Sequence, residues 1–193
     1  MDDTAFARLV SLACHDLRTP LATVNGFAKT LERQVELAPP ADRYVEMIVA
    51  AAAQLDELLD ELSLAARIEG GRYEPNLQET DTLAIARAAA QRLGEDRVHV
   101  SGEAGRVRVD VRAIERGVSA LVQSVLRHGG LEETTVRVEG SEITVDGVSD
   151  ASGPVVLGED LRDLGAAVAV KLVRTLGGSV ERDGSTLRIL LPQ

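Results

Sequence analysis

The first seventy residues carry apolar positions at a helical spacing. From Val10 these positions recur every three or four residues, the pattern of a helix packed along one face. Two prolines within residues 37–43 interrupt it, and a second series begins at Val45 and stops at Gly70-Gly71. The spacing therefore predicts two long helices joined by a short loop. The first series is Val10, Ala13, Leu17, Leu21, Val24, Ala28, Leu31 and Val35, and the second is Val45, Ile48, Ala52, Leu55, Leu59, Leu62 and Ala66.

Two antiparallel helices alone would leave much of these apolar stripes in contact with water. A second copy of the hairpin, completing a four-helix bundle, is the simplest way to cover them. We therefore expect a homodimer.

After a polar connection over residues 70–81, short β-like runs alternate with helical stretches. Strands connected mostly by hairpins predict an α+β layered sandwich, in which helices cover one face of a sheet. We assign residues 1–71 to the helical hairpin domain and residues 76–193 to the sandwich domain. The expected helices span 82–93, 111–127 and 161–176, the expected strands span 97–100, 106–109, 134–139 and 142–148, and a closing hairpin spans 177–191 with Asp183-Gly184 at its turn.

Composition narrows the classes of partner. The net charge of −10 argues against a protein that binds the phosphate backbone of nucleic acids, and two Phe, two Tyr and no Trp leave little material for base stacking. No apolar run approaches the roughly 18 residues of a membrane span, and the N-terminus does not read as a signal peptide. A single cysteine, Cys14, fits a reducing environment, so we expect a cytoplasmic protein, and we interpret this thiol as a small buried hydrophobe.

His15 is the candidate reactive residue. With Leu17 at heptad position a, His15 falls at f, the position furthest from the packed seam. A single histidine on a helix surface is most often only a solvated side chain, but its neighbours change this interpretation. Asp16 can accept a hydrogen bond from one ring nitrogen and so raise the nucleophilicity of the other. Thr19 follows one turn later, and Pro20 leaves the carbonyl of Asp16 without its helical donor.

The stretch HDLRTPLATVNGF (15–27) resembles the H-box of the dimerisation and phosphoacceptor domain of bacterial sensor histidine kinases. Residues 62–89 resemble the connection from that domain into the ATP-binding domain of the same family. The resemblance implies that His15 takes up a phosphoryl group and passes it to an aspartate of a response-regulator receiver domain, with Mg²⁺ supplied by that partner. It also implies that Asp16 and Thr19 support dephosphorylation of the regulator. The H-box match runs in order over His15, Asp16, Leu17, Arg18, Thr19, Pro20 and Leu21.

The second domain of that family binds ATP through an Asn-bearing helix, an Asp-x-Gly-x-Gly loop and a Gly-x-Gly loop, and this sequence departs at each. Ser124 stands where the Mg²⁺-binding Asn is expected, and Asp146 is followed directly by Gly147, so that Asp-x-Gly-x-Gly cannot be read there. The tripeptide DLG (163–165) replaces Gly-x-Gly and places the carboxylate of Asp163 where phosphate charge would lie. The segment between Asp146 and Gly165 is also too short for the family's mobile lid.

These departures predict the scaffold of a histidine-kinase ATPase domain without its nucleotide chemistry, and neither an intrinsic cofactor nor a metal site is expected. We therefore favour a histidine phosphotransferase in a phosphorelay, loaded by an upstream histidine kinase or a phosphorylated receiver domain. Two alternatives stay open. One is an ATP-dependent sensor kinase core that autophosphorylates His15, and the other is a non-catalytic scaffold that binds and blocks a regulator.

Other polar residues receive structural interpretations. His99 and His128 have no metal-ligand spacing with each other or with Cys14, so we interpret them as structural or solvated. An acidic run on the second predicted helix is expected to be a solvated face, with docking of a regulator as the alternative. It comprises Asp56, Glu57, Asp60 and Glu61.

Overall fold

The chain divides into two compact units, Met1–Tyr73 and Glu74–Gln193. The structure is a computed structural model that describes residues 3–34, 37 and 39–193. The division falls within the polar connection 70–81. No helix within the described residues is both long enough and apolar enough to cross a lipid bilayer.

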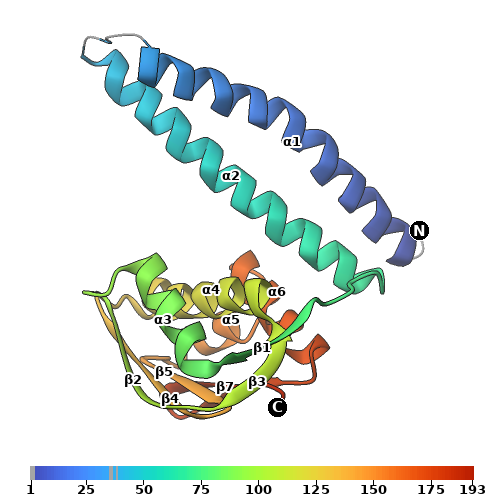
Figure 1. Cartoon of the computed structure of the whole chain (residues 1–193), viewed down its shortest axis with the longest axis vertical. Helices are drawn as coiled ribbons and strands as arrows, with labels where there is room; N and C mark the ends of the chain where they lie inside the picture. The colour runs from blue at the N-terminus through green and yellow to red at the C-terminus, as the bar shows by residue number, and fades with distance from the viewer. Residues whose placement is uncertain (1–2, 35–36, 38) are drawn as a thin grey trace. The chain divides into compact units, whose positions relative to one another are not determined.

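The first unit is a helical hairpin, as the apolar spacing predicts (Figure 1). Helix α1 spans Asp3–Gln34 and helix α2 spans Ala41–Glu69, and the two pack antiparallel along their length. Gly70 ends α2, where its N–H donates to the carbonyl of Ala66 at 3.0 Å. The guanidinium of Arg72 then donates to the carbonyl of Ala7 and to Ser11 Oγ, which fastens the end of the hairpin to the start of α1.

Small side chains form the seam between the two helices. On α1 the residues Ala7, Cys14 and Ala28 are buried, and Leu21 between them is half-buried. These positions repeat every seven residues, so they lie on one side of the helix. Because the distance between packed helices depends on the side chains at the contact, small residues here let the two backbones approach closely.

The larger apolar stripe of α1 lies beside this seam. Leu17, Val24 and Leu31 are 55%, 50% and 44% exposed. Our assignment of these leucine and valine positions to the packed seam is therefore wrong for the contact between α1 and α2, because the small residues form that contact. Each hairpin instead presents its bulky apolar side chains to the surroundings.

The second unit is an α+β sandwich (Figure 1). Five strands form one sheet in the order β2-β4-β5-β7-β6, in which only the β2–β4 pair is parallel. A separate antiparallel ladder pairs β1 with β3. The strands are β1 (Leu77–Asp81), β2 (Val98–Ala104), β3 (Arg106–Asp110), β4 (Thr134–Gly140), β5 (Glu142–Asp146), β6 (Ser179–Asp183) and β7 (Thr186–Leu190).

Helices cover one face of the five-stranded sheet, and α4 lies between α3 and α6. The alternating strands turn their apolar side chains toward these helices, because successive residues of a strand point to opposite faces. The core is wholly aliphatic and includes Ile85, Ile114, Leu121, Ile143, Leu187 and Ile189, all fully buried. The helices are α3 (Thr82–Leu93), α4 (Val111–Gly129), α5 (Gly153–Val156) and α6 (Leu164–Thr175).

The structure corrects several sequence-based boundaries. The polar connection contains strand β1, whose residues show no apolar alternation and are held mainly by the backbone ladder to β3. The loop after β5 contains the short helix α5, and the helix expected at 161 begins at Leu164. The strand expected over 97–100 extends to Ala104, and β5 ends at Asp146 instead of residue 148. The final hairpin turns at Gly184 and Ser185, because Asp183 still pairs with Thr186.

Candidate functional site

His15 stands on the solvent face of α1. Its side chain is 80% exposed and that of Asp16 is 67% exposed, so the outward position expected from the heptad pattern is confirmed. The Nδ1 atom of His15 lies 3.1 Å from Asp16 Oδ1. When Nδ1 carries the proton and donates to this carboxylate, Nε2 keeps its lone pair and faces solvent. The pair therefore presents one nucleophilic nitrogen to an approaching molecule.

Cys14 has the opposite environment although it precedes His15 directly. Its side chain is 1% exposed and lies in the seam toward α2. Each residue of an α-helix turns the chain by about 100°, which separates the two side chains. The interpretation of this thiol as a buried hydrophobe is confirmed.

Thr19 and Pro20 extend the surface around His15. Thr19 is exposed and lies one helical turn after His15, on the same face. Its carbonyl accepts a hydrogen bond from Thr23 Oγ1 at 3.1 Å. Pro20 is accommodated inside α1, which continues to Gln34. The helix thus gathers His15, Asp16 and Thr19 on one exposed face, as their spacing indicates.

Arg18 links this surface to α2. Its guanidinium hydrogen-bonds to Asp60 and lies 3.9 Å from Asp56, so both carboxylates of α2 face it. The acidic run is therefore only partly a solvated face, because Asp60 and Glu61 are half-buried in the hairpin. Nothing in the local sequence indicates this ion pair, since its partners are 42 residues apart.

In the second unit, the N-terminus of α6 is occupied by the chain's own carboxylate. Asp163 caps this helix: its Oδ1 accepts the N–H of Ala166 at 3.1 Å. Its Oδ2 lies 3.1 Å from Nε2 of His128, near the end of α4. Both side chains are largely buried. A helix N-terminus attracts anions through its free N–H groups and its dipole, and here Asp163 already satisfies that attraction.

Ser124 lies on α4, one helical turn before His128. The side chain is buried and its hydroxyl oxygen has no hydrogen-bond partner in the described part of the chain. The same helix buries Val125 and Leu126 beside it. A hydroxyl in such surroundings offers a Mg²⁺ ion a single weak ligand, whereas Mg²⁺ requires several oxygens in octahedral geometry.

Asp146, at the end of β5, is committed to contacts within the sheet. Its carboxylate pairs with Arg137 at 2.9 Å and accepts a hydrogen bond from Thr186 Oγ1 at 3.3 Å. Its carbonyl accepts a hydrogen bond from Thr134 Oγ1 at 2.6 Å. The carboxylate that the resemblance assigns to base recognition thus holds neighbouring strands together.

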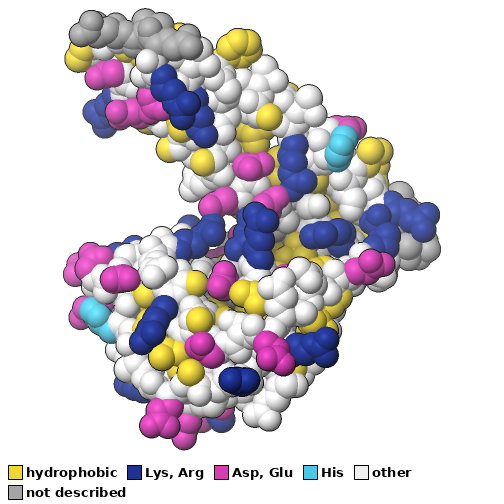
Figure 2. Space-filling view, viewed as in Figure 1, with side chains coloured by type: hydrophobic (Ala, Val, Ile, Leu, Met, Phe, Trp, Pro, Cys, Tyr) yellow, Lys and Arg dark blue, Asp and Glu magenta, His cyan; other side chains and the backbone are white. Residues whose placement is uncertain are grey.

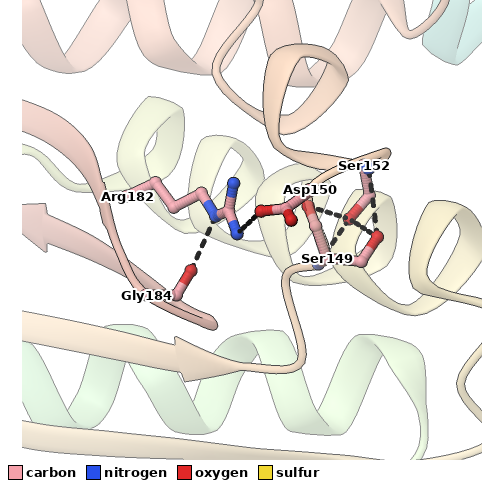
Figure 3. Close-up of polar contacts among 5 residues, drawn as sticks. All are labelled: Ser149, Asp150, Ser152, Arg182 and Gly184. Carbon is pink, nitrogen blue, oxygen red and sulfur yellow. Dashed lines mark hydrogen bonds and ion pairs between the residues drawn. The ribbon is translucent and has the colours of Figure 1, made fainter.

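The loop after β5 is tied to the β6–β7 hairpin (Figure 3). Arg182 donates to Asp150 Oδ1 at 2.6 Å and to the carbonyl of Gly184 at 2.7 Å. Ser149 and Ser152 exchange hydrogen bonds between the backbone N–H of each and the hydroxyl of the other, at 2.9 and 3.1 Å. The turn from Ser149 to Ser152 is therefore closed by its own hydrogen bonds and joined to the hairpin through Asp150.

The remaining histidine has a local partner. Nε2 of His99 lies 2.9 Å from Glu133 Oε2 at the surface, so both His99 and His128 have the structural roles expected of them. Among the described residues, no group of three His, Cys, Asp or Glu side chains is arranged to hold a metal ion.

Comparison with known proteins connects these features. Residues 7–71 match the family model of the His Kinase A (phospho-acceptor) domain, which contains His15. The chain is also similar to curated sensor proteins and histidine kinases. It is 26% identical over 208 residues to the sensor protein DivL of Caulobacter vibrioides, covering 93% of this chain and 27% of that protein. It is also 26% identical over 141 residues to the signal transduction histidine-protein kinase AfsQ2 of Streptomyces coelicolor, covering 66% of this chain and 26% of that protein. The chain thus spans about a quarter of the length of these curated relatives.

The fold agrees with a solved structure. The crystal structure of full-length ShkA in complex with AMPPNP superposes with a TM-score of 0.69 at 17% identity, covering 94% of this chain and 44% of that chain. The predicted fold class, a helical hairpin followed by an α/β domain of the histidine-kinase ATPase type, is confirmed. At this identity the likeness concerns the fold alone.

Proposed function

We propose that this protein is a histidine phosphotransferase of a phosphorelay, in which His15 exchanges a phosphoryl group with an aspartate of a receiver domain. The observation that carries the proposal is the exposed imidazole of His15, hydrogen-bonded at Nδ1 to Asp16 within the matched phosphoacceptor domain. Its free nitrogen is open to a protein-sized donor. We expect the receiver domain to supply the Mg²⁺ for the transfer.

The transfer is a displacement at phosphorus. Nε2 of His15 attacks the phosphorus of an aspartyl phosphate, a nitrogen–phosphorus bond forms, and the bond to the leaving carboxylate oxygen breaks. The proton stays on Nδ1, where the carboxylate of Asp16 balances the positive charge that develops on the ring. The reverse step returns the phosphoryl group to the aspartate of another receiver domain.

Three features of the second unit favour a relay over an ATP-dependent kinase. Asp163 fills the N-terminus of α6, where a phosphate would otherwise gain most from the helix dipole. The buried hydroxyl of Ser124 has no hydrogen-bond partner in the described part of the chain and would offer Mg²⁺ a single weak ligand. Asp146 is paired with Arg137, and the loop that follows is fastened to the last hairpin.

Labelling experiments test the proposal. The full chain is incubated with Mg²⁺ and radiolabelled ATP, and separately with phosphorylated receiver domains from its own organism. We expect label to pass from a receiver to the wild type and to His99→Ala, the matched control histidine, and not to His15→Ala. Robust labelling of His15 from ATP would contradict the relay.

The alternative, an ATP-dependent sensor kinase core, is favoured by the likeness to AfsQ2 of Streptomyces coelicolor, which is named as a histidine-protein kinase. A titration with a fluorescent ATP analogue separates the two functions, because the relay predicts no saturable binding. A non-catalytic scaffold would bind receiver domains while neither the wild type nor the His15→Ala variant acquires label.

We further propose that Asp16 and Thr19 support dephosphorylation of the receiver partner. Both are exposed on α1 close to His15, and in this proposal the hydroxyl of Thr19 orients a water molecule at an approaching aspartyl phosphate. Thr19→Ala should slow loss of phosphate from the receiver without preventing labelling of His15. Equal rates of loss for the wild type and this variant would refute the role of Thr19.

A further inference from the structure

The three long helices of the second unit form a strongly basic surface on an acidic protein. Together α3, α4 and α6 contain seven Lys or Arg residues and a single acidic residue, Glu115, whereas the whole chain has a net charge of −10. We call the solvent face of these helices the basic helical surface. Its cations are Arg87, Arg92, Arg112, Arg116, Arg127, Lys171 and Arg174.

Packing directs these cations outward. The opposite side of each helix is apolar and buried against the sheet, so the charged side chains have only the solvent face left. Along α4 the residues Arg112, Arg116 and Arg127 follow one another at intervals that keep them on one side. Figure 2 shows Lys and Arg side chains along this helical layer.

Several of these cations have no partner of opposite charge. Arg87, Arg112, Arg127 and Arg174 are exposed and form no ion pair with any residue that the structure describes. Elsewhere in the unit most arginines are paired with carboxylates, including Arg137 with Asp146, Arg182 with Asp150 and Arg188 with Glu142. The basic helical surface thus carries unpaired positive charge, whereas most arginines elsewhere in the unit are neutralised by carboxylates.

The exposed cations of β3 differ in their surroundings. Arg106 and Arg108 stand directly opposite Asp81 and Glu79 in the β1–β3 ladder. Their field is offset by these carboxylates across the ladder. A change at Arg108 therefore serves as a control for changes on the basic helical surface.

The side chains present favour carboxylates as the ligand. Six of the seven cations are arginines, whose planar guanidinium groups pair with carboxylates in a fork-like geometry. The described residues of these helices include no exposed large hydrophobic side chain that could anchor a membrane. Residues 74–193 contain no aromatic side chain on which a nucleic-acid base could stack.

We propose that the basic helical surface docks an acidic face of the receiver-domain partner, an inference that rests on the proposed function. Phosphoryl transfer to an aspartate with Mg²⁺ requires a cluster of carboxylates on the partner, because Mg²⁺ is held by oxygen ligands. The hairpin carries an exposed carboxylate of its own beside His15, that of Asp16, which repels such a cluster. Positive charge on the second unit offsets this repulsion and accelerates encounter.

Charge reversal tests the proposal in the full-length protein. The double variant Arg112→Glu/Arg127→Glu is compared with the wild type and with Arg108→Glu, and transfer to His15 is followed from a panel of phosphorylated receiver domains. At about 0.05 M salt we expect the double variant to lower kcat/KM about tenfold through KM, with kcat unchanged. At about 0.5 M salt the difference should nearly vanish, because the Debye length then falls to a few ångströms. Arg108→Glu should stay within about twofold of the wild type.

The other possible outcomes distinguish failure of the proposed function from failure of the docking inference. If no receiver domain labels wild-type His15, the proposed function fails. If receivers label the wild type and the double variant at equal rates, only the docking inference fails. An equal loss in Arg108→Glu would indicate a general charge effect and also overturn it. Should the glutamate variant not fold, by circular dichroism, Arg112→Gln/Arg127→Gln provides the same comparison with a smaller expected change.

A vesicle experiment separates the membrane alternative. The wild type and the double variant are sedimented with phosphatidylglycerol and with phosphatidylcholine vesicles. We expect no sedimentation of either protein. Binding to phosphatidylglycerol that the double variant loses, together with unchanged receiver kinetics, would assign the basic helical surface to an anionic membrane and overturn the proposal.

Discussion

Single residues of this protein owe their roles to the helix face on which they fall. Cys14 and His15 are adjacent in sequence, yet one is buried in the hairpin seam and the other is open to solvent. The same principle separates Ser119 and Ser124, which are both buried on α4. Ser119 Oγ donates to the carbonyl of Glu115 at 2.7 Å, whereas the hydroxyl of Ser124 has no partner in the described part of the chain.

Removing the hydroxyl of Ser124 should therefore stabilise the protein or leave it unchanged. An unpartnered buried hydroxyl costs about 1–3 kcal/mol of desolvation, and alanine avoids that cost. Urea unfolding of Ser124→Ala should give a free energy of unfolding equal to the wild type or up to about 1 kcal/mol higher. Ser119→Ala, which loses a bonded hydroxyl from the same helix, should be the less stable of the two variants. If Ser124→Ala had a clearly lower free energy of unfolding than Ser119→Ala, the hydroxyl of Ser124 would not be an unpartnered buried group.

At the scale of elements, a few side chains fasten one segment to another. Thr82, the first residue of α3, is fully buried. Its hydroxyl donates to the carbonyl of Gly140 at 2.6 Å and accepts the N–H of Gly105 at 3.0 Å. One side chain thus connects the start of α3 to the β2–β3 and β4–β5 connections.

Thr82→Val preserves the shape of this side chain but leaves the carbonyl of Gly140 and the N–H of Gly105, both in part-buried hydrogen bonds, without their partner. We expect a loss of about 1–3 kcal/mol in the free energy of unfolding, measured by urea denaturation. Thr175→Val is the matched control, because its hydroxyl bonds the carbonyl of Lys171 at an exposed site and should change stability by less than about 0.5 kcal/mol. Equal effects in the two variants would exclude a bridging role for Thr82.

A pair of charges joins β5 to β7. Arg188 donates to both carboxylate oxygens of Glu142, at 3.1 and 2.7 Å, and these bonds lower the pKa of Glu142 below its ordinary value. A lowered pKa in the folded state means that the pair contributes stability above the pKa of an unfolded glutamate. That contribution is lost as the pH falls through the folded pKa.

Glu142→Gln should consequently be less stable than the wild type at neutral pH. The difference should shrink as the pH falls below about 4, because the wild-type carboxyl then becomes neutral as well. Urea unfolding of both proteins across this pH range provides the measurement. A stability difference independent of pH would show that the charge of Glu142 does not contribute.

At the scale of the whole molecule, the hairpin exposes more large apolar side chains than one copy can cover. They recur at heptad intervals on both helices, and Figure 2 shows hydrophobic side chains open to solvent on the hairpin. A second copy that completes a four-helix bundle remains our prediction for this surface. The exposed side chains include Phe6, Leu9, Leu17, Val24, Phe27 and Leu31 on α1, and Tyr44, Ile48, Leu55, Leu58 and Leu62 on α2.

A charge placed in this stripe should separate the predicted dimer. At micromolar concentration, light scattering coupled to gel filtration should give the wild type twice the mass of one chain, and Leu55→Glu the mass of a single chain. Lys29→Glu is the control, because Lys29 is exposed two heptads after His15, on the face away from the stripe, and should leave the dimer intact. A monomeric wild type would refute the prediction.

Local signals were enough to predict most of the secondary structure. The helix over 82–93 was placed correctly because Asp81 caps its first turn and Gly94 follows its last residue. Strand β1 was not predicted because its sequence LQETD has no alternation of apolar residues. The strand forms by pairing with β3. An element whose own side chains carry a cap or an apolar pattern can be predicted from the sequence. An element that forms only by pairing with another strand cannot.

The sequence by itself determined which residue is the candidate phosphoacceptor, since His15, Asp16 and Thr19 are brought together by the pitch of a single helix. Only the tertiary structure decided how the second unit fills its α6 N-terminus. The pairing of His128 with Asp163 joins residues 35 positions apart, and neither position indicates the other. Such contacts arise when helices pack side by side on the sheet, and the same packing gathers arginines from three separate helices into one basic surface.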